Sequence, residues 1–101
     1  MINITLICAA GMSTSMLMAK MEQSAIDREL DVHTIAMSES SFEGYSGSTD
    51  ILLLGPQISY LEDEIRNKYE GSGMKIKVID MMDYGMMNGE KVLDDALSMI
   101  D

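Results

Sequence analysis

The sequence predicts an α/β fold with an open parallel sheet, and three observations support this class. Short apolar runs of strand length alternate with longer stretches that have helical periodicity. The run 50–54 is apolar after its first residue, as in a strand that is covered on both faces. Gly55-Pro56 and Gly71-Ser72-Gly73 then mark sharp boundaries between elements. With right-handed crossovers, this pattern predicts a parallel sheet with helices on both faces.

The first half of the chain predicts a strand, a helix and a second strand. Residues 2–7 are apolar except for Asn3 and Thr5 and are too few for a helix. From about residue 13 to 30 the apolar positions have helical spacing, with charged residues between them. Residues 31–37 alternate imperfectly and predict the second strand. The Ser-, Glu- and Gly-rich stretch 38–48 predicts a loop with room for one helical turn.

The second half repeats the alternation. Asp50–Leu54 is the third expected strand, and Pro56 suits the first turn of a helix that ends before Gly71. Residues 74–79 form the fourth expected strand, with Asp80 at its end. A final helix is expected over about 89–100. We therefore expect one domain over residues 1–101, since the chain is short and nothing in it reads as a linker.

Composition excludes several classes of function. A formal charge of −10 opposes binding to nucleic acid and to anionic lipid surfaces. No run approaches the roughly 20 apolar residues that cross a bilayer, and the first basic residue, Lys20, comes too late for an export signal. The single cysteine cannot form an internal disulfide, which favours a reducing, cytoplasmic location. The 12 methionines are scattered without His or Cys clusters, which favours core filling over copper binding.

The connection between the first strand and the first helix is the candidate site. Residues 8–15 contain no proline, acid or base, so all their backbone N–H groups are available to an anion. The following helix adds the partial positive charge of its N-terminus. We expect phosphate binding by this loop, without a metal ion or an organic cofactor. The candidate phosphate-binding residues are Ala9, Ala10, Gly11, Met12, Ser13, Thr14 and Ser15.

Cys8 opens this loop at the carboxyl end of a strand, where open parallel sheets bind their ligands. A helix N-terminus lowers the pKa of a nearby thiol from about 8.5 and so favours the nucleophilic thiolate. We therefore interpret Cys8 as the catalytic nucleophile in phosphoryl transfer.

Two other functions remain open on these residues alone. Low-molecular-weight tyrosine phosphatases open a similar loop with C-x5-R-S, but Thr14 stands here where their arginine would clamp the phosphoryl oxygens. Losing that clamp should slow ester hydrolysis by several powers of ten, which favours a carrier over a hydrolase. A non-catalytic anion-binding module with Cys8 as a redox sensor is the third reading.

The loop 8–15, together with Leu54-Gly55-Pro56-Gln57-Ile58, Val78-Ile79-Asp80 and Tyr84-Gly85, resembles the IIB component of the bacterial sugar phosphotransferase system (PTS), of the lactose/cellobiose (chitobiose) type. The resemblance covers essentially the whole chain. It implies a four-stranded parallel sheet in the order 2-1-3-4 and phosphorylation of Cys8 by a phosphohistidine of the IIA protein. It also implies onward transfer to a disaccharide-type sugar held by the membrane carrier IIC.

The implied strand order adds expectations for four further residues. The crevice between strands one and three would bring Gln57 close to Cys8, as a candidate neighbour of the phosphoryl group, although a solvent-exposed polar residue at a helix start is an equal alternative. A carboxylate there would repel a phosphate dianion, so we interpret Asp80 as a helix or loop cap. Tyr84 follows on the same edge without an assigned role. His33, at the start of the second strand, is interpreted as structural or exposed.

Overall fold

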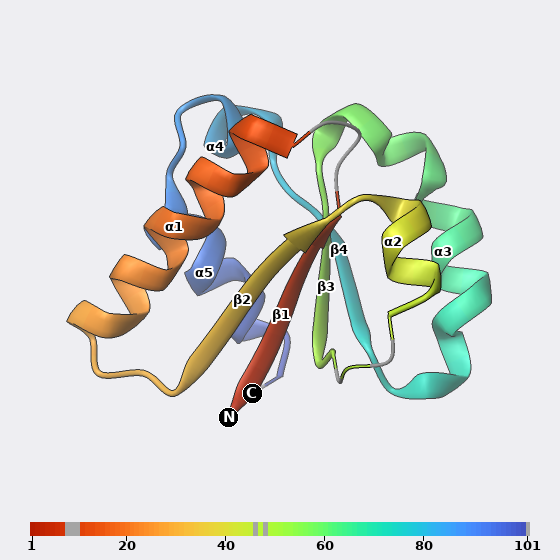
Figure 1. The fold of residues 1–101 in the computed structure, drawn as a ribbon, viewed down its shortest axis with the longest axis horizontal. Helices are drawn as coiled ribbons and strands as arrows, with labels where there is room; N and C mark the ends of the chain where they lie inside the picture. Colours follow the sequence, from red (N-terminus) through yellow and green to blue (C-terminus); the bar gives the residue numbers. More distant parts are fainter. Residues whose placement is uncertain (8–10, 46, 48, 101) are drawn as a thin grey trace.

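The computed structural model describes residues 1–7, 11–45, 47 and 49–100, without the side chains of residues 11–14 and 70. Its centre is a four-stranded sheet in the order β2-β1-β3-β4 in which all neighbouring strands are parallel (Figure 1). The strands are β1 (Ile2–Ile7), β2 (Val32–Met37), β3 (Ile51–Leu54) and β4 (Lys75–Val78). The predicted fold class and strand order are confirmed.

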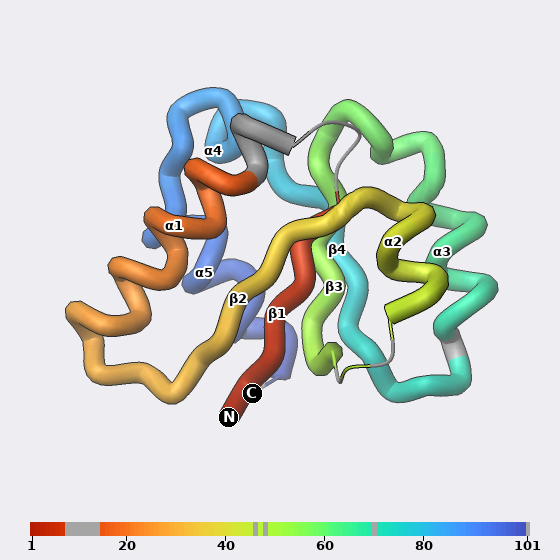
Figure 2. The backbone as a smooth tube through the Cα atoms, in the orientation of Figure 1, coloured from red at the N-terminus to blue at the C-terminus, as the bar shows by residue number. Residues whose placement is uncertain are grey.

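Helices cover both faces of this sheet (Figure 1). Helices α1, α4 and α5 lie on one side and α2 and α3 on the other, as the tube in Figure 2 also shows. The helical elements in the described part of the chain are α1 (Gly11–Asp27), α2 (Glu39–Glu43), η1 (Pro56–Leu61), α3 (Glu62–Tyr69), η2 (Glu70–Ser72), α4 (Met81–Gly85) and α5 (Gly89–Ser98).

The sheet divides the core into two apolar clusters because successive strand side chains point to opposite faces. Ile4 and Leu6 of β1 belong to the cluster under α1 and α5, whereas Ile7 packs with Phe42 and Ile65 on the α2 and α3 side. All four residues of β3 are buried. Burial on both faces explains why this strand is a continuous apolar run in the sequence.

Helix α1 begins and ends earlier than the sequence predicts. It ends at Asp27 because Glu29 adopts a left-handed backbone with φ 56°. The N–H of Leu30 then donates to the carbonyl of Ala25 at 2.8 Å and that of Glu29 to Ile26 at 3.0 Å. These are the two bonds of a Schellman motif, formed here without the glycine that usually signals it.

The expected single helix from Pro56 to Tyr69 is wrong, since it is two elements. The 3-10 segment η1 contains a non-helical residue, Ile58 (φ −116°, ψ 25°), and α3 starts only at Glu62. Helix α4 was not predicted at all, because five residues are too few to show a helical period. The turn predicted in the 38–48 stretch is present as α2.

Candidate functional site

The site sits at the sheet edge where the parallel strands end. Ile7 is the last residue of β1, and its carbonyl accepts a hydrogen bond of 2.9 Å from the N–H of Gly55, just after β3. The carbonyl of Leu54 in turn accepts one of 2.8 Å from Ile79, just after β4. Strands β1, β3 and β4 therefore end side by side at one edge of the sheet.

The strand order makes the gap between β1 and β3 a topological switch point. The chain passes from β1 outward to β2 through α1, and from β3 outward the other way to β4 through α3. Helices α1 and α3 consequently lie on opposite faces and diverge from this gap (Figure 2). Open α/β sheets bind their ligands in such a crevice, at the carboxyl ends of the strands.

The predicted site residues fall partly outside the described structure. Cys8, Ala9 and Ala10 lie outside the described residues. The backbone of residues 11–14 forms the first turn of α1, and Ser15 follows with an exposed side chain. The predicted loop over residues 8–15 is thus shorter than expected, because α1 begins at Gly11. Residues 11–14 supply the first N–H groups of the helix, which have no partner within the helix itself.

The charge at the start of α1 sets it apart from the other α-helices described. Its first turn contains no acidic residue, whereas those of α2, α4 and α5 contain one each and that of α3 contains three. Acidic side chains usually occupy first turns because they compensate the positive end of the helix dipole. No acidic residue in the first turn of α1 therefore compensates the positive end of its dipole.

Gln57 lies at the start of η1, two residues after Gly55, and its side chain is exposed. The hydrogen bond between Gly55 and Ile7 ties this segment to the residue before Cys8. The segment containing Gln57 therefore starts at the same sheet edge, and its contact with a phosphoryl group stays a prediction.

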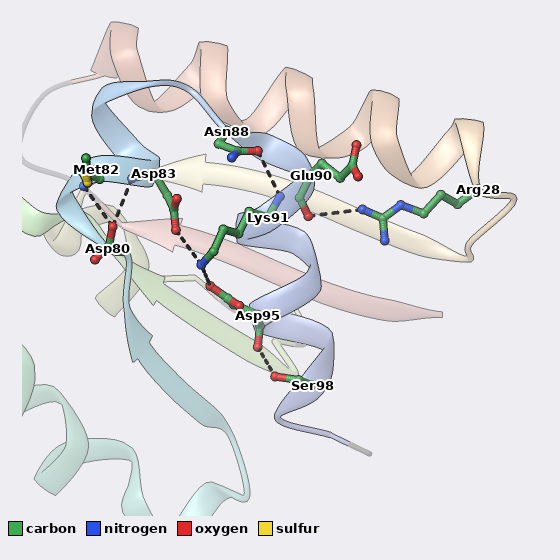
Figure 3. A network of polar contacts seen from close by, with 9 residues as sticks. All are labelled: Arg28, Asp80, Met82, Asp83, Asn88, Glu90, Lys91, Asp95 and Ser98. Atoms are coloured by element: carbon green, nitrogen blue, oxygen red, sulfur yellow. Dashed lines mark hydrogen bonds and ion pairs between the residues drawn. The ribbon is translucent and has the colours of Figure 1, made fainter.

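Asp80 is the N-cap of α4, as interpreted. Its carboxylate accepts hydrogen bonds from the N–H groups of Met82 (3.0 Å) and Asp83 (3.2 Å) (Figure 3). Tyr84, left without a role by the sequence, is buried in the core cluster beneath α1 and α5. Both residues hold α4 in place at this edge.

An ion-pair network joins α4 to α5 (Figure 3). The Lys91 ammonium donates to Asp83 and to Asp95, each at 3.0 Å. These hydrogen bonds, the one to Asp95 first, raise the pKa of Lys91 above its ordinary 10.5. The sequence analysis does not predict the ion pairs of Lys91. The spacing of Lys91 and Asp95 on one helix face was a visible signal, but the pairing with Asp83 depends on the turn between two helices.

Helix α5 also fixes the position of α1. A Cβ atom on the buried Gly89 would lie 2.7 Å from the carbonyl carbon of Lys20 and the amide nitrogen of Met21, so only glycine allows this approach. Nearer the end of α1, Arg28 pairs with Asp94 and donates to the carbonyl of Glu90 at 3.2 Å. The start of α1 is therefore placed by packing along the helix.

His33 lies on the edge strand β2, paired in register with Asn3, and is exposed. It is at the start of its strand, away from the edge where Ile7 ends. Within the described residues, no three His, Cys, Asp or Glu side chains gather to hold a metal ion. Likewise, none of the described helices is both long and apolar enough to cross a membrane.

Comparison with known proteins connects this arrangement to one family. The sequence model of "PTS system, Lactose/Cellobiose specific IIB subunit" matches residues 3–95. The cellobiose-specific and galactose-specific EIIB components of Lactococcus lactis are 42% and 41% identical, each over 97% of this chain and 95% of theirs. The oligo-beta-mannoside-specific EIIB component of Bacillus subtilis is 35% identical with the same coverage.

Two solved structures of IIB proteins are also similar to this chain. The cellobiose-specific IIB protein of Borrelia burgdorferi is 36% identical, with a TM-score of 0.78 over 96% of this chain and 89% of that one. The lactose-specific IIB domain of Streptococcus pneumoniae matches with a TM-score of 0.86 over 96% and 95% of the two chains. At 20% identity, that second likeness shows the fold alone.

The family match covers most of the chain, and none of these relatives is a phosphatase, so nothing supports the hydrolase alternative. PTS IIB components are phosphotransferases that transfer phosphate from IIA to the sugar. The chain belongs to the lactose/cellobiose-specific IIB subunits of the phosphotransferase system and is a sugar-specific phosphoryl carrier.

Proposed function

We propose that Cys8 is the residue that carries the phosphoryl group. It accepts the group from a phosphohistidine of IIA and passes it to a sugar held by the membrane carrier IIC. The observation that supports this most is the hydrogen bond between Ile7 and Gly55, because it joins the residue that precedes Cys8 in the chain to the end of β3, at the switch point of the sheet. The acid-free first turn of α1 supports it independently.

The chemistry needs two displacements at phosphorus. The Cys8 thiolate attacks the phosphohistidine, the S–P bond forms, the N–P bond breaks and the imidazole leaves. A sugar hydroxyl then attacks the same phosphorus, the S–P bond breaks and the thiolate returns, while the hydroxyl proton passes to solvent or to a base. The chain contributes the nucleophile and the groups that hold the phosphoryl oxygens.

The amides of residues 9–15 and the hydroxyls of Ser13, Thr14 and Ser15 are proposed to bind those oxygens, with Gln57 as a neighbour. Thr14 stands where the phosphatase loop has its arginine. Without that clamp, water attack on the phosphocysteine is slow, and the group survives until an acceptor docks. A carrier requires a phosphocysteine that lasts until the acceptor binds.

The sugar is proposed to be of the disaccharide type. The curated relatives are named for cellobiose, galactose and oligo-beta-mannoside, although their identities to this chain fall between 35% and 42%. Such similar chains with different sugars agree with recognition of the sugar by IIC. We propose that residues 1–101 act as one IIB domain on the cytoplasmic side of the membrane, where IIA and IIC are both accessible.

The test is phosphoryl transfer from phosphorylated IIA, followed by intact-mass measurement. The wild-type chain should gain one phosphoryl group, and Cys8→Ser should gain none, because a serine hydroxyl is far less ionised than a thiol near neutral pH. Thermal unfolding of Cys8→Ser checks that the fold is kept. A Cys8→Ser protein that is phosphorylated as fast as the wild type would overturn the proposal.

A further inference from the structure

We infer that Asn88, in the turn between α4 and α5, is a site of spontaneous deamidation and isomerisation that the fold protects. Of the three asparagines in the sequence, Asn3, Asn67 and Asn88, only Asn88 is followed by glycine. A side-chain amide reacts with the backbone nitrogen of the next residue, and glycine obstructs that nitrogen least because it has no Cβ. This modification is independent of phosphoryl transfer.

The reaction is a ring closure followed by hydrolysis. The backbone nitrogen of Gly89, after losing its proton to hydroxide, attacks Cγ of Asn88. The N–Cγ bond forms, the Cγ–Nδ2 bond breaks, and ammonia leaves with a proton from water. Water then opens the cyclic imide at one of its two carbonyls. Breaking the new N–Cγ bond gives aspartate, whereas breaking the old backbone C–N bond gives isoaspartate, whose main chain runs through the side-chain carbon.

The packing of α5 against α1 requires the glycine of this pair. Gly89 is buried, and a Cβ atom on it would lie 2.7 Å from the carbonyl carbon of Lys20 and the amide nitrogen of Met21. Asn88 is the N-cap of α5, and its side-chain oxygen accepts a hydrogen bond of 3.2 Å from the N–H of Lys91 (Figure 3). The close contact between the helices thus places an Asn-Gly pair at the start of α5.

The folded turn keeps the two reacting groups apart. Asn88 (φ −81°, ψ 74°) is the central residue of an inverse γ-turn, in which the N–H of Gly89 donates to the carbonyl of Met87 at 2.9 Å. For an L-residue, this ψ places the next backbone nitrogen anti to Cβ, so the Gly89 nitrogen points away from the Asn88 side chain. Ring closure therefore requires the γ-turn to open.

Several contacts hold this turn closed. The N–H of Asn88 donates to the carbonyl of Asp83 at 2.9 Å, and that of Met87 donates to Tyr84 at 3.1 Å. The ion pair between Lys91 and Asp83 crosses the turn. We therefore expect deamidation only from chains in which the turn has opened, locally or by unfolding.

The two products should differ in their effect on the fold. Aspartate caps a helix about as well as asparagine, so this product keeps the start of α5. Isoaspartate adds one carbon to the main chain immediately before Gly89, whose position is fixed by its contact with α1. The γ-turn or the close approach must then give way. Isoaspartate at position 88 should therefore loosen α5 from α1.

The test follows deamidation of the whole chain in mildly alkaline buffer, with and without urea, by peptide mapping and mass spectrometry. In urea, Asn88 should deamidate at least about tenfold faster than Asn3 or Asn67. Without urea, its rate should be at least about tenfold lower than in urea, because only the open turn reacts. Equal rates for the three asparagines in urea, or equal rates for Asn88 in the two solutions, would overturn the inference.

Two variants test whether the turn controls the reaction in the folded chain. Asp83→Asn breaks the ion pair that crosses the turn and should speed deamidation of Asn88 about threefold or more. Asp95→Asn breaks the other ion pair of Lys91, which has the same length of 3.0 Å but lies within α5, and should leave the rate nearly unchanged. Equal rates in these two variants would overturn protection by the turn.

Limited proteolysis of the deamidated sample, after return to buffer without urea, separates the effects of the two products. Isoaspartate at position 88 should be at least about threefold enriched in the chains that are cleaved first, and aspartate should not be. Asn88→Asp, which has the same charge without the extra main-chain carbon, should unfold at nearly the wild-type temperature. Isoaspartate that is equally abundant in cleaved and intact chains would overturn the inferred loss of packing.

Discussion

The starts of α1 and α4 lie at the same edge of the sheet, but only the start of α4 has an acidic side chain bound to its amides. At α4 the chain supplies its own anion, the Asp80 carboxylate, which accepts hydrogen bonds from two free amides. At α1 the first turn contains no acid, and β1, the strand before it in the chain, ends beside β3 at the switch point. One helix start is capped by an acidic residue of the chain, and the other is the one that we propose binds the phosphoryl group.

The two helices also show which contacts fix a helix in its position. Helix α4 is capped by Asp80, paired through Asp83 and packed through Tyr84, so the chain itself fixes its position. Helix α1 is held by the close approach of Gly89 of α5 to Lys20 and Met21 and by the contacts of Arg28, all beyond its first turn. The residues that position α1 thus differ from those that we propose bind the anion.

The largest expected effect comes from closing the start of α1 with an acid. Ser13→Asp should slow phosphoryl transfer from IIA about tenfold or more, because its carboxylate competes for the same amides and repels phosphate. The negative charge should also raise the pKa of the Cys8 thiol, measured from the pH dependence of alkylation.

Two variants isolate the charge and the position. Ser13→Asn has nearly the same shape without the charge and should lose much less activity. Ser40→Asp adds the same charge to the first turn of α2 and should leave transfer unchanged. Equal rates for Ser13→Asp and Ser13→Asn would show that the start of α1 does not bind the phosphoryl group.

A smaller effect is expected from opening the start of α4. Asp80→Ala leaves the N–H groups of Met82 and Asp83 without their acceptor and should lower the free energy of unfolding by about 0.5–2 kcal/mol. Asp80→Asn retains a capping oxygen and should recover most of this loss. Chemical denaturation measures both, and equal stability of Asp80→Ala and wild type would rule out the cap as a stabilising contact.

The smallest effect concerns Lys91 and depends on pH. The folded-state pKa of Lys91 is raised above 10.5, so its ion pairs stabilise the fold fully below that pH and are lost as the pH rises through the folded-state pKa. Lys91→Met should therefore be less stable than the wild type at pH 8, and the difference should shrink in strongly alkaline solution. A difference that stays constant with pH would mean that Lys91 acts through packing alone.

Much of this fold could be predicted from the sequence because the strands have distinct patterns. The continuous apolar run of β3 indicated burial on both faces, and the family resemblance supplied the strand order that the structure confirms. The wrong predictions, the end of α1 and the missed helix α4, have local causes. The Schellman motif at Glu29 lacks its usual glycine, and α4 is shorter than any period that could reveal it.

The sequence predicts a chemistry for the site, but it does not predict the contacts that support the site. A cysteine that opens a loop of small residues between a strand and a helix predicts phosphate binding, and Asp80 after β4 was recognisable as a cap. The close approach at Gly89 and the pairing of Asp83 with Lys91 join elements whose relative placement no local pattern encodes. Such contacts appear only once the helices are packed.

Amide NMR of the chain before and after phosphorylation by IIA tests the contrast between the two helix starts most directly. The account predicts large shifts for the amides of residues 9–15 and little change for those of Met82 and Asp83, which Asp80 already occupies. Large shifts at the start of α4, with residues 9–15 unmoved, would contradict it.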